Sequence, residues 1–78
     1  MPRAAAVSEP LTAREQDVLV LLAQGHANPA IARSLGISRA TVKVHVEHIL
    51  GKLGVHSRTR AVLEAVRLGL LGVPGAAD

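Results

Sequence analysis

Four segments of this 78-residue sequence each begin with residues that favour the first turn of a helix. Thr12 and Glu15 form a capping box, in which each side chain can bond the backbone N–H of the other residue. The other N-cap candidates are Asn28, which precedes Pro29, and the serines Ser38 and Ser57. With glycines near the ends and apolar residues at helical spacing, the pattern predicts helices over residues 12–24, 28–35, 38–53 and 57–70. We therefore predict an all-α fold.

The chain is long enough for one hydrophobic core. We expect a single folded domain over residues 11–71. Residues 1–10 are rich in alanine and carry Pro2 and Pro10, so they read as a linker or a terminal extension. Residues 72–78 read as a flexible tail.

Two residue classes are missing, and their absence excludes several kinds of protein. Without cysteine there is no disulfide scaffold, thiolate zinc site or cysteine nucleophile. The chain has no Phe, Tyr or Trp, the side chains on which single-stranded nucleic acids usually stack, so an RNA-recognition sheet or an OB-fold is disfavoured. No apolar stretch is long enough to span a bilayer, and we expect a cytoplasmic protein without a cofactor or metal.

Positive charge is concentrated in the middle of the chain. Between Asn28 and Arg60 there are six basic residues and one acid, Glu47, whereas the rest of the chain has three basic residues and five acids. A basic patch on a small domain is the expected footprint of a polyanionic partner, although a solvated basic face has the same composition.

The second and third predicted helices have the spacing of a DNA-binding helix-turn-helix. With Asn28 as the first position, Ala32 is fifth, Gly36 ninth and Val42 fifteenth. Ala32 is small where two helices cross closely, Gly36 permits a positive φ in the turn, and Val42 plugs the second helix onto the first. A generic helical hairpin could carry the same residues, but the charge clustering favours DNA binding.

The helix predicted over 38–53 has an apolar inner stripe and a mixed outer face. The stripe consists of Val42, Val46, Ile49 and Leu53. Val44 lies opposite, where it could meet a thymine methyl group, although single exposed apolar residues are common. Lys43 suits a guanine edge or a phosphate, and Glu47 could accept from a cytosine amino group or pair with Lys43 one turn away. We predict that Lys43, Val44 and Glu47 contact base edges.

Polar and basic residues near both ends of this helix are candidates for the DNA backbone. They are Arg39, Thr41, Lys52, Arg58 and Arg60. Such contacts set register and affinity, carry no sequence information and imply a steep salt dependence.

Several linked motifs resemble the LuxR-type helix-turn-helix domain, also called the NarL/FixJ or GerE type. They are Leu11-Thr12-Ala13-Arg14-Glu15, Leu21-Leu22-Ala23-Gln24-Gly25, Ile31-Ala32, Leu35-Gly36-Ile37-Ser38, Thr41-Val42-Lys43-Val44-His45, Lys52-Leu53-Gly54-Val55, and Arg58 with Ala61-Val62. The likeness covers about residues 11–71. It implies a four-helix domain that binds duplex DNA as a homodimer, with the third helix in the major groove and the fourth in the dimer contact. It also implies a C-terminal output module behind a phosphorylated receiver or a ligand-binding sensor, or a stand-alone regulator.

The fourth predicted helix supplies the candidate dimer surface. Its inward stripe is expected to be Val62, Ala65, Val66 and Gly69, which leaves Leu63, Arg67 and Leu70 along one flank. We expect a small interface that is weak without DNA or an upstream domain.

The chain departs from the family pattern at the start of the second helix. Family members commonly read Ser-Asn-Lys-Glu there, whereas this chain reads Ala27-Asn28-Pro29-Ala30. An acid on the inner face of the first helix, Glu15, is therefore expected to have a different partner.

Two other functions remain open. A metal or hydrolytic site could use His26, His45, His48 and His56, but neither a third ligand on one face nor an activating acid accompanies them. A protein-interaction module could instead contact RNA polymerase or a sensor domain without reading DNA.

Overall fold

The computed structural model describes residues 9–71, which form four α-helices and no strand in that range. The helices are α1 (Ala13–Ala23), α2 (Asn28–Leu35), α3 (Arg39–Leu53) and α4 (Arg58–Arg67). The predicted all-α fold is confirmed. The tail predicted for 72–78 and most of the linker predicted for 1–10 lie outside the described residues, so those bounds stay predictions.

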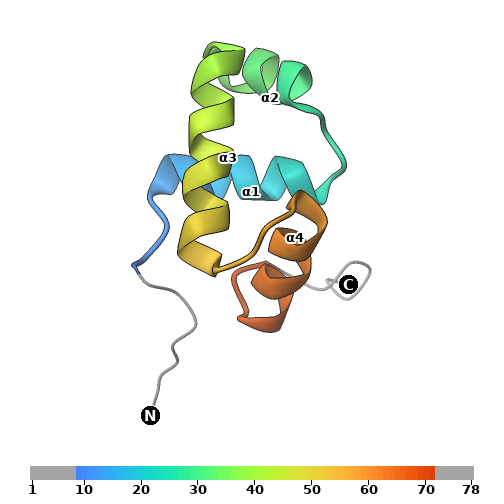
Figure 1. The fold of residues 1–78 in the computed structure, drawn as a ribbon. Helices are drawn as coiled ribbons and strands as arrows, with labels where there is room; N and C mark the ends of the chain where they lie inside the picture. The colour runs from blue at the N-terminus through green and yellow to red at the C-terminus, as the bar shows by residue number, and fades with distance from the viewer. Residues whose placement is uncertain (1–8, 72–78) are drawn as a thin grey trace.

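The longest helix, α3, is the centre of the domain and packs against each of the other three. In Figure 1 it runs from top to bottom, with α2 beside its first turns and α4 beside its end, while α1 crosses its middle. The first helix also contacts α2 and α4, whereas α2 and α4 do not pack against each other. Consequently the two ends of α3 lie in different surroundings.

A single apolar core joins the four helices. Its buried members are Val18, Leu19, Leu22, Ile31, Ala32, Val42, Val46, Ile49, Leu53, Ala61 and Ala65. The inner stripe predicted for the third helix is confirmed, because all four of its residues are buried. The stripe predicted for the fourth helix is partly wrong. Ala65 is buried, but Val62 and Val66 are only partly buried and Gly69 is exposed, whereas the buried Ala61 was not predicted.

Three of the four predicted caps are confirmed. Thr12 and Glu15 form the reciprocal capping box, and the Ser38 and Ser57 hydroxyls accept from backbone N–H groups inside their helices. The prediction for Asn28 is wrong. The N-cap of α2 is Ala27, which makes no side-chain bond, and Asn28 is already helical, with its side-chain oxygen accepting from Arg58.

The fourth helix ends at Arg67, three residues before the predicted end. Gly69 has φ +80°, and the N–H of Leu70 donates to the carbonyl of Ala65 at 2.8 Å. This is a Schellman ending, in which a left-handed glycine turns the chain back over the last helical turn. Leu70 therefore folds onto the core, and its carbonyl accepts from Nε2 of Gln16 at 2.9 Å.

Candidate nucleic-acid interface

The turn between α2 and α3 gives the two helices their relative placement. Gly36 has φ +69° and a left-handed conformation, and the N–H of Ile37 donates to the carbonyl of Ala32 at 3.1 Å. Ala32 is 6% exposed and Val42 is fully buried, so both residues lie between the two helices, as their spacing predicted. The pair is a helix-turn-helix.

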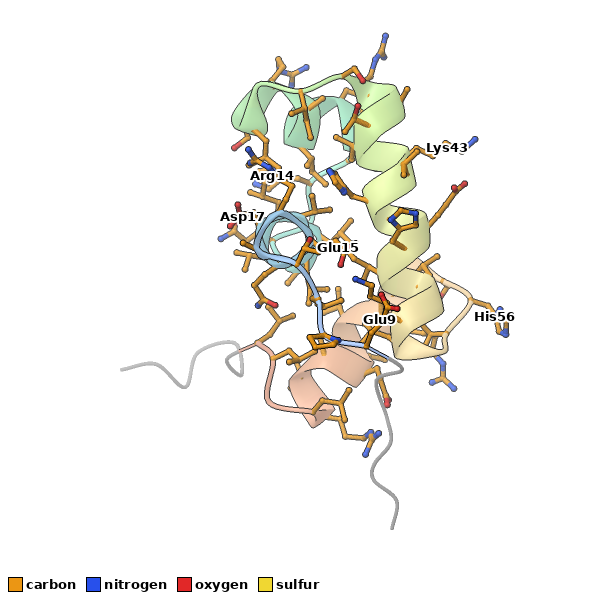
Figure 2. The ribbon with its side chains drawn as sticks, turned by 90° about the vertical axis from the view of Figure 1, so that its left-hand side faces the viewer. Glu9, Arg14, Glu15, Asp17, Lys43 and His56 are labelled. Atoms are coloured by element: carbon orange, nitrogen blue, oxygen red, sulfur yellow. The ribbon has the colours of Figure 1, made fainter. Side chains whose placement is uncertain are left out.

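The outer face of α3 is solvent exposed along most of its length. The exposed residues include Ala40, Lys43, Val44, Glu47, His48 and Gly51. Val44 is 46% exposed although it is β-branched and apolar. Figure 2 shows Lys43 pointing away from the molecule on the side opposite Arg14 and Asp17 of α1. The three predicted base-edge residues, Lys43, Val44 and Glu47, thus share one accessible face.

The alternative pairing of Glu47 with Lys43 is absent from the structure. Both side chains are exposed, and no ion pair joins them among those found within residues 9–71. Both charged groups therefore face solvent.

The start of α3 brings two of the predicted backbone-contact residues to the surface. Arg39 and Thr41 are exposed, and the Thr41 hydroxyl lies 2.9 Å from the Ser38 hydroxyl. A shallow hollow beside the turn is lined by Arg33 and Arg39 together with parts of Pro29, Ala32 and Ile37. Arg33 was not among the predicted contacts, although its place in the basic stretch of the sequence could have indicated it.

Lys52, another predicted backbone-contact residue, is engaged within the domain. Its side chain is 13% exposed, and Nζ donates to Oε1 of Glu15 at 2.6 Å and to the Pro10 carbonyl at 3.1 Å. A carboxylate oxygen of Glu9 lies 3.5 Å from the same nitrogen. The hydrogen bond to Glu15 raises the pKa of Lys52 against the opposing effect of burial, and the charges of Glu15 and Glu9 raise it further.

Glu15 is the one buried charged residue among residues 9–71, with only 3% of its surface exposed. Figure 2 places it between α1 and α3. Burial alone would raise the pKa of its carboxyl group. The bonds from Lys52 and from the N–H of Thr12, with the charges of Lys52 and His48, outweigh burial and lower that pKa. Sequence reasoning placed Glu15 on the inner face but did not identify Lys52 as its partner.

The two remaining predicted backbone contacts, Arg58 and Arg60, differ in their surroundings. Arg58 is half-buried and donates to Oδ1 of Asn28 and to the carbonyl of His26. Arg60 is exposed, and its N–H donates to the Ser57 hydroxyl. Only Arg60 presents its charge openly to solvent.

The predicted dimer residues are separated by the early end of α4. Leu63 is 56% exposed, the most exposed large apolar residue in the described part of the chain. Arg67 is exposed and paired with Glu64, and the hydrogen bond from Arg67 lowers the pKa of that carboxyl group more than burial raises it. Leu70 is only partly exposed and packs on its own core. Leu63 and Arg67 therefore form the available part of this surface.

The histidines do not converge. Within residues 9–71, no three His, Asp or Glu side chains are placed to hold a metal ion. His48 lies 3.6 Å from the Glu15 carboxylate, and Nδ1 of His45 is buried without a hydrogen-bond partner. The described helices also include none that is long and apolar enough to cross a membrane.

These features define a helix-turn-helix domain, and comparison with known proteins identifies its family. Residues 9–65 match the GerE family model, described as bacterial regulatory proteins of the luxR family. The chain is 49% identical over 69 residues to a probable transcriptional regulatory protein NarL of Mycobacterium tuberculosis, covering 88% of this chain and 32% of the relative. It is 44% identical over 71 residues to the response regulator VraR of Staphylococcus aureus, covering 91% and 34%.

Two solved structures share the fold. The response regulator ChrA of a heme-sensing two-component system superposes with a TM-score of 0.78 at 44% identity, over 91% of this chain and 33% of that one. The transcription factor GerE superposes with a TM-score of 0.75 at 40% identity, over 80% and 92%.

The chain belongs to the luxR family of bacterial regulatory proteins, whose helix-turn-helix domain binds DNA in transcription regulation and is not an enzyme. It spans about a third of the length of the curated relatives it matches.

Proposed function

We propose that this domain binds specific duplex DNA sites as a homodimer on paired half-sites, with α3 in the major groove. The observation that carries the proposal is the outer face of α3. Its opposite face is buried in the core, yet Lys43, Val44 and Glu47 stand exposed together on a helix that follows a helix-turn-helix turn. An α-helix fits the major groove, where base edges are distinguishable.

The three exposed side chains offer three different kinds of base contact. Lys43 supplies donors for the acceptors of guanine, Glu47 supplies acceptors for the cytosine amino group, and Val44 supplies an apolar surface for the thymine methyl. Because Lys43 and Glu47 are not paired with each other, neither contact requires an ion pair to break first.

Backbone contacts are assigned to side chains that reach solvent. Arg39 and Thr41 at the start of α3, and Arg60 at the start of α4, meet this condition. Arg33 is added because it lines the same hollow as Arg39 beside the turn. Lys52 is left out, since its ammonium group already bonds Glu15 and the Pro10 carbonyl.

The dimer contact is assigned to the exposed side of α4, around Leu63 and Arg67. Leu70 is left out because it packs on its own core. Two exposed side chains make only a small contact, and small contacts do not hold a stable dimer, so we expect assembly to depend on DNA or on an upstream domain. The response regulators among the relatives support an upstream receiver and a cytoplasmic location.

Selection of binding sites from random duplex DNA at about physiological salt tests the proposal. The wild type is compared with Lys43→Ala and Val44→Ala. Matched controls are Arg14→Ala and Val20→Ala, since Arg14 is an exposed cation of α1 and Val20 is an apolar residue of α1 that is 37% exposed. We expect a motif with two related half-sites whose base preferences change in the α3 variants and stay unchanged in the α1 controls.

Enrichment of no motif would contradict the proposal. If partner binding were instead apolar and insensitive to salt, the domain would be a protein-interaction module that contacts RNA polymerase or a sensor domain.

A further inference from the structure

Arg58, the first residue of α4, places its guanidinium on the segment that leads into α2. Nη1 donates to Oδ1 of Asn28 at 2.5 Å, and Nη2 donates to the carbonyl of His26 at 3.1 Å. These acceptors lie 30 and 32 residues earlier in the chain. Figure 1 shows the start of α4 beside the end of α1, where the connection to α2 begins. One side chain therefore joins the beginnings of two helices.

The beginning of α2 lacks a side-chain cap of its own. Its N-cap, Ala27, has no side-chain oxygen, and the side-chain oxygen of Asn28 accepts from Arg58 instead of capping the helix. The two helices joined in this way each pack on α1 and α3 and do not pack on each other. The Arg58 bonds are thus a direct polar link between α4 and the helix-turn-helix.

A guanidinium is suited to this position because its planar fork carries several donors in fixed directions. Here two of its nitrogens meet two acceptors on different residues. The same engagement and the half-buried position leave Arg58 less available to a phosphate than Arg60, which is exposed two residues later.

We propose that Arg58 is a positioning residue for DNA binding. It holds the first turn of α2, and with it the helix-turn-helix, in a fixed orientation against α4, and it makes no phosphate contact. This inference rests on the proposed function. It replaces the sequence-based expectation that Arg58 contacts the DNA backbone.

The salt dependence of binding separates the two roles. Each cation that contacts a phosphate contributes about one unit to the slope of log affinity against log salt concentration. The slope is measured for the wild type, Arg58→Gln, Asn28→Ala and Arg60→Gln on one duplex chosen by selection with the wild type. Asn28→Ala removes the acceptor without removing a charge, and Arg60→Gln serves as the phosphate-contact control.

We expect Arg58→Gln and Asn28→Ala each to weaken binding by about three- to tenfold while the slope stays at its wild-type value. Arg60→Gln is expected to reduce the slope by about one unit. Arg58→Lys keeps the charge but loses the fork, so it should bind as weakly as Arg58→Gln. In the free protein, the amide NMR signals of His26 and Asn28 should shift in Arg58→Lys.

A slope reduced by about one unit in Arg58→Gln, with wild-type binding by Arg58→Lys and Asn28→Ala, would overturn the inference. If the wild type bound no duplex, the proposed function would fail instead. The NMR comparison would then decide on Arg58 alone, because unchanged signals at His26 and Asn28 would exclude a positioning role.

Discussion

Replacing Glu15 by glutamine should lower the free energy of unfolding, because the carboxylate is buried and accepts two hydrogen bonds. Its Oε1 accepts from Nζ of Lys52 at 2.6 Å and from the N–H of Thr12 at 3.0 Å. Glutamine keeps an oxygen for both donors, so the loss is the charge-assisted part of each bond, about 1 kcal/mol per bond. The lower cost of burying a neutral amide offsets part of this loss, which leaves about 1 to 2 kcal/mol.

In a domain of this size, that loss lowers the melting temperature by about 5 to 15 °C. The assay is thermal unfolding at pH 7, followed by circular dichroism. The control is Asp17→Asn, which removes a different acid from the same helix. The Asp17 side chain is 57% exposed and lies 3.6 Å from an Arg14 nitrogen. We expect the control to melt within about 3 °C of the wild type, since exposed pairs contribute little.

The pH dependence gives a second check on Glu15. Because its pKa is lower in the folded than in the unfolded state, its contribution is fully present above the unfolded pKa and is lost as pH falls through the folded pKa. The difference between wild type and Glu15→Gln should therefore shrink in acid. Equal melting temperatures of Glu15→Gln and Asp17→Asn at pH 7 would show that the buried Glu15 carboxylate contributes no more stability than an exposed acid.

Three further tests address the turn, the core and the dimer surface. Gly36→Ala forces φ +69° on an alanine whose Cβ would meet no atom within 4 Å, so it should cost about 1 to 2 kcal/mol, whereas the helical Gly51→Ala should stabilise by about 0.5 to 1 kcal/mol; urea unfolding compares them. Ile49→Ala empties a fully buried position and should cost about 2 to 5 kcal/mol in the same assay, and a loss below about 1 kcal/mol would place the residue outside the core. Leu63→Glu should weaken binding to paired half-sites more than to one half-site in gel-shift titrations, and an equal loss on both would exclude Leu63 from the dimer contact.

The parts of the fold that were predicted correctly are those that neighbouring residues determine. The capping box of Thr12 and Glu15 lies within one turn, and the stripe from Val42 to Leu53 follows from helical periodicity alone. The exposed position of Val44 follows from the same periodicity. The early end of α4 was missed because the leucines after Gly69 continue the apolar pattern while the glycine takes a positive φ.

The polar contacts between distant segments were beyond sequence reasoning. Lys52 and Glu15 lie 37 residues apart, and Arg58 and Asn28 lie 30 residues apart. A charge count treats both cations as available to DNA phosphates. Only the packing of α3 and α4 against α1 shows that acceptors within the domain already bind them. The exposed cations near the turn, such as Arg33 and Arg39, are therefore better candidates for phosphate contacts in the proposed interface.

If the outer face of α3 contacts base edges, the loss of a thymine methyl group should weaken binding only while Val44 is present, and combined substitutions in protein and DNA measure this. In a duplex selected by the wild type, each thymine is replaced in turn by uracil, which removes only the methyl group from the major groove. Affinities are measured for the wild type and for Val44→Ala. We predict one position per half-site where the uracil weakens the wild type by about three- to fivefold and leaves Val44→Ala unaffected. Equal effects of every uracil on both proteins would contradict the placement of this face against the bases.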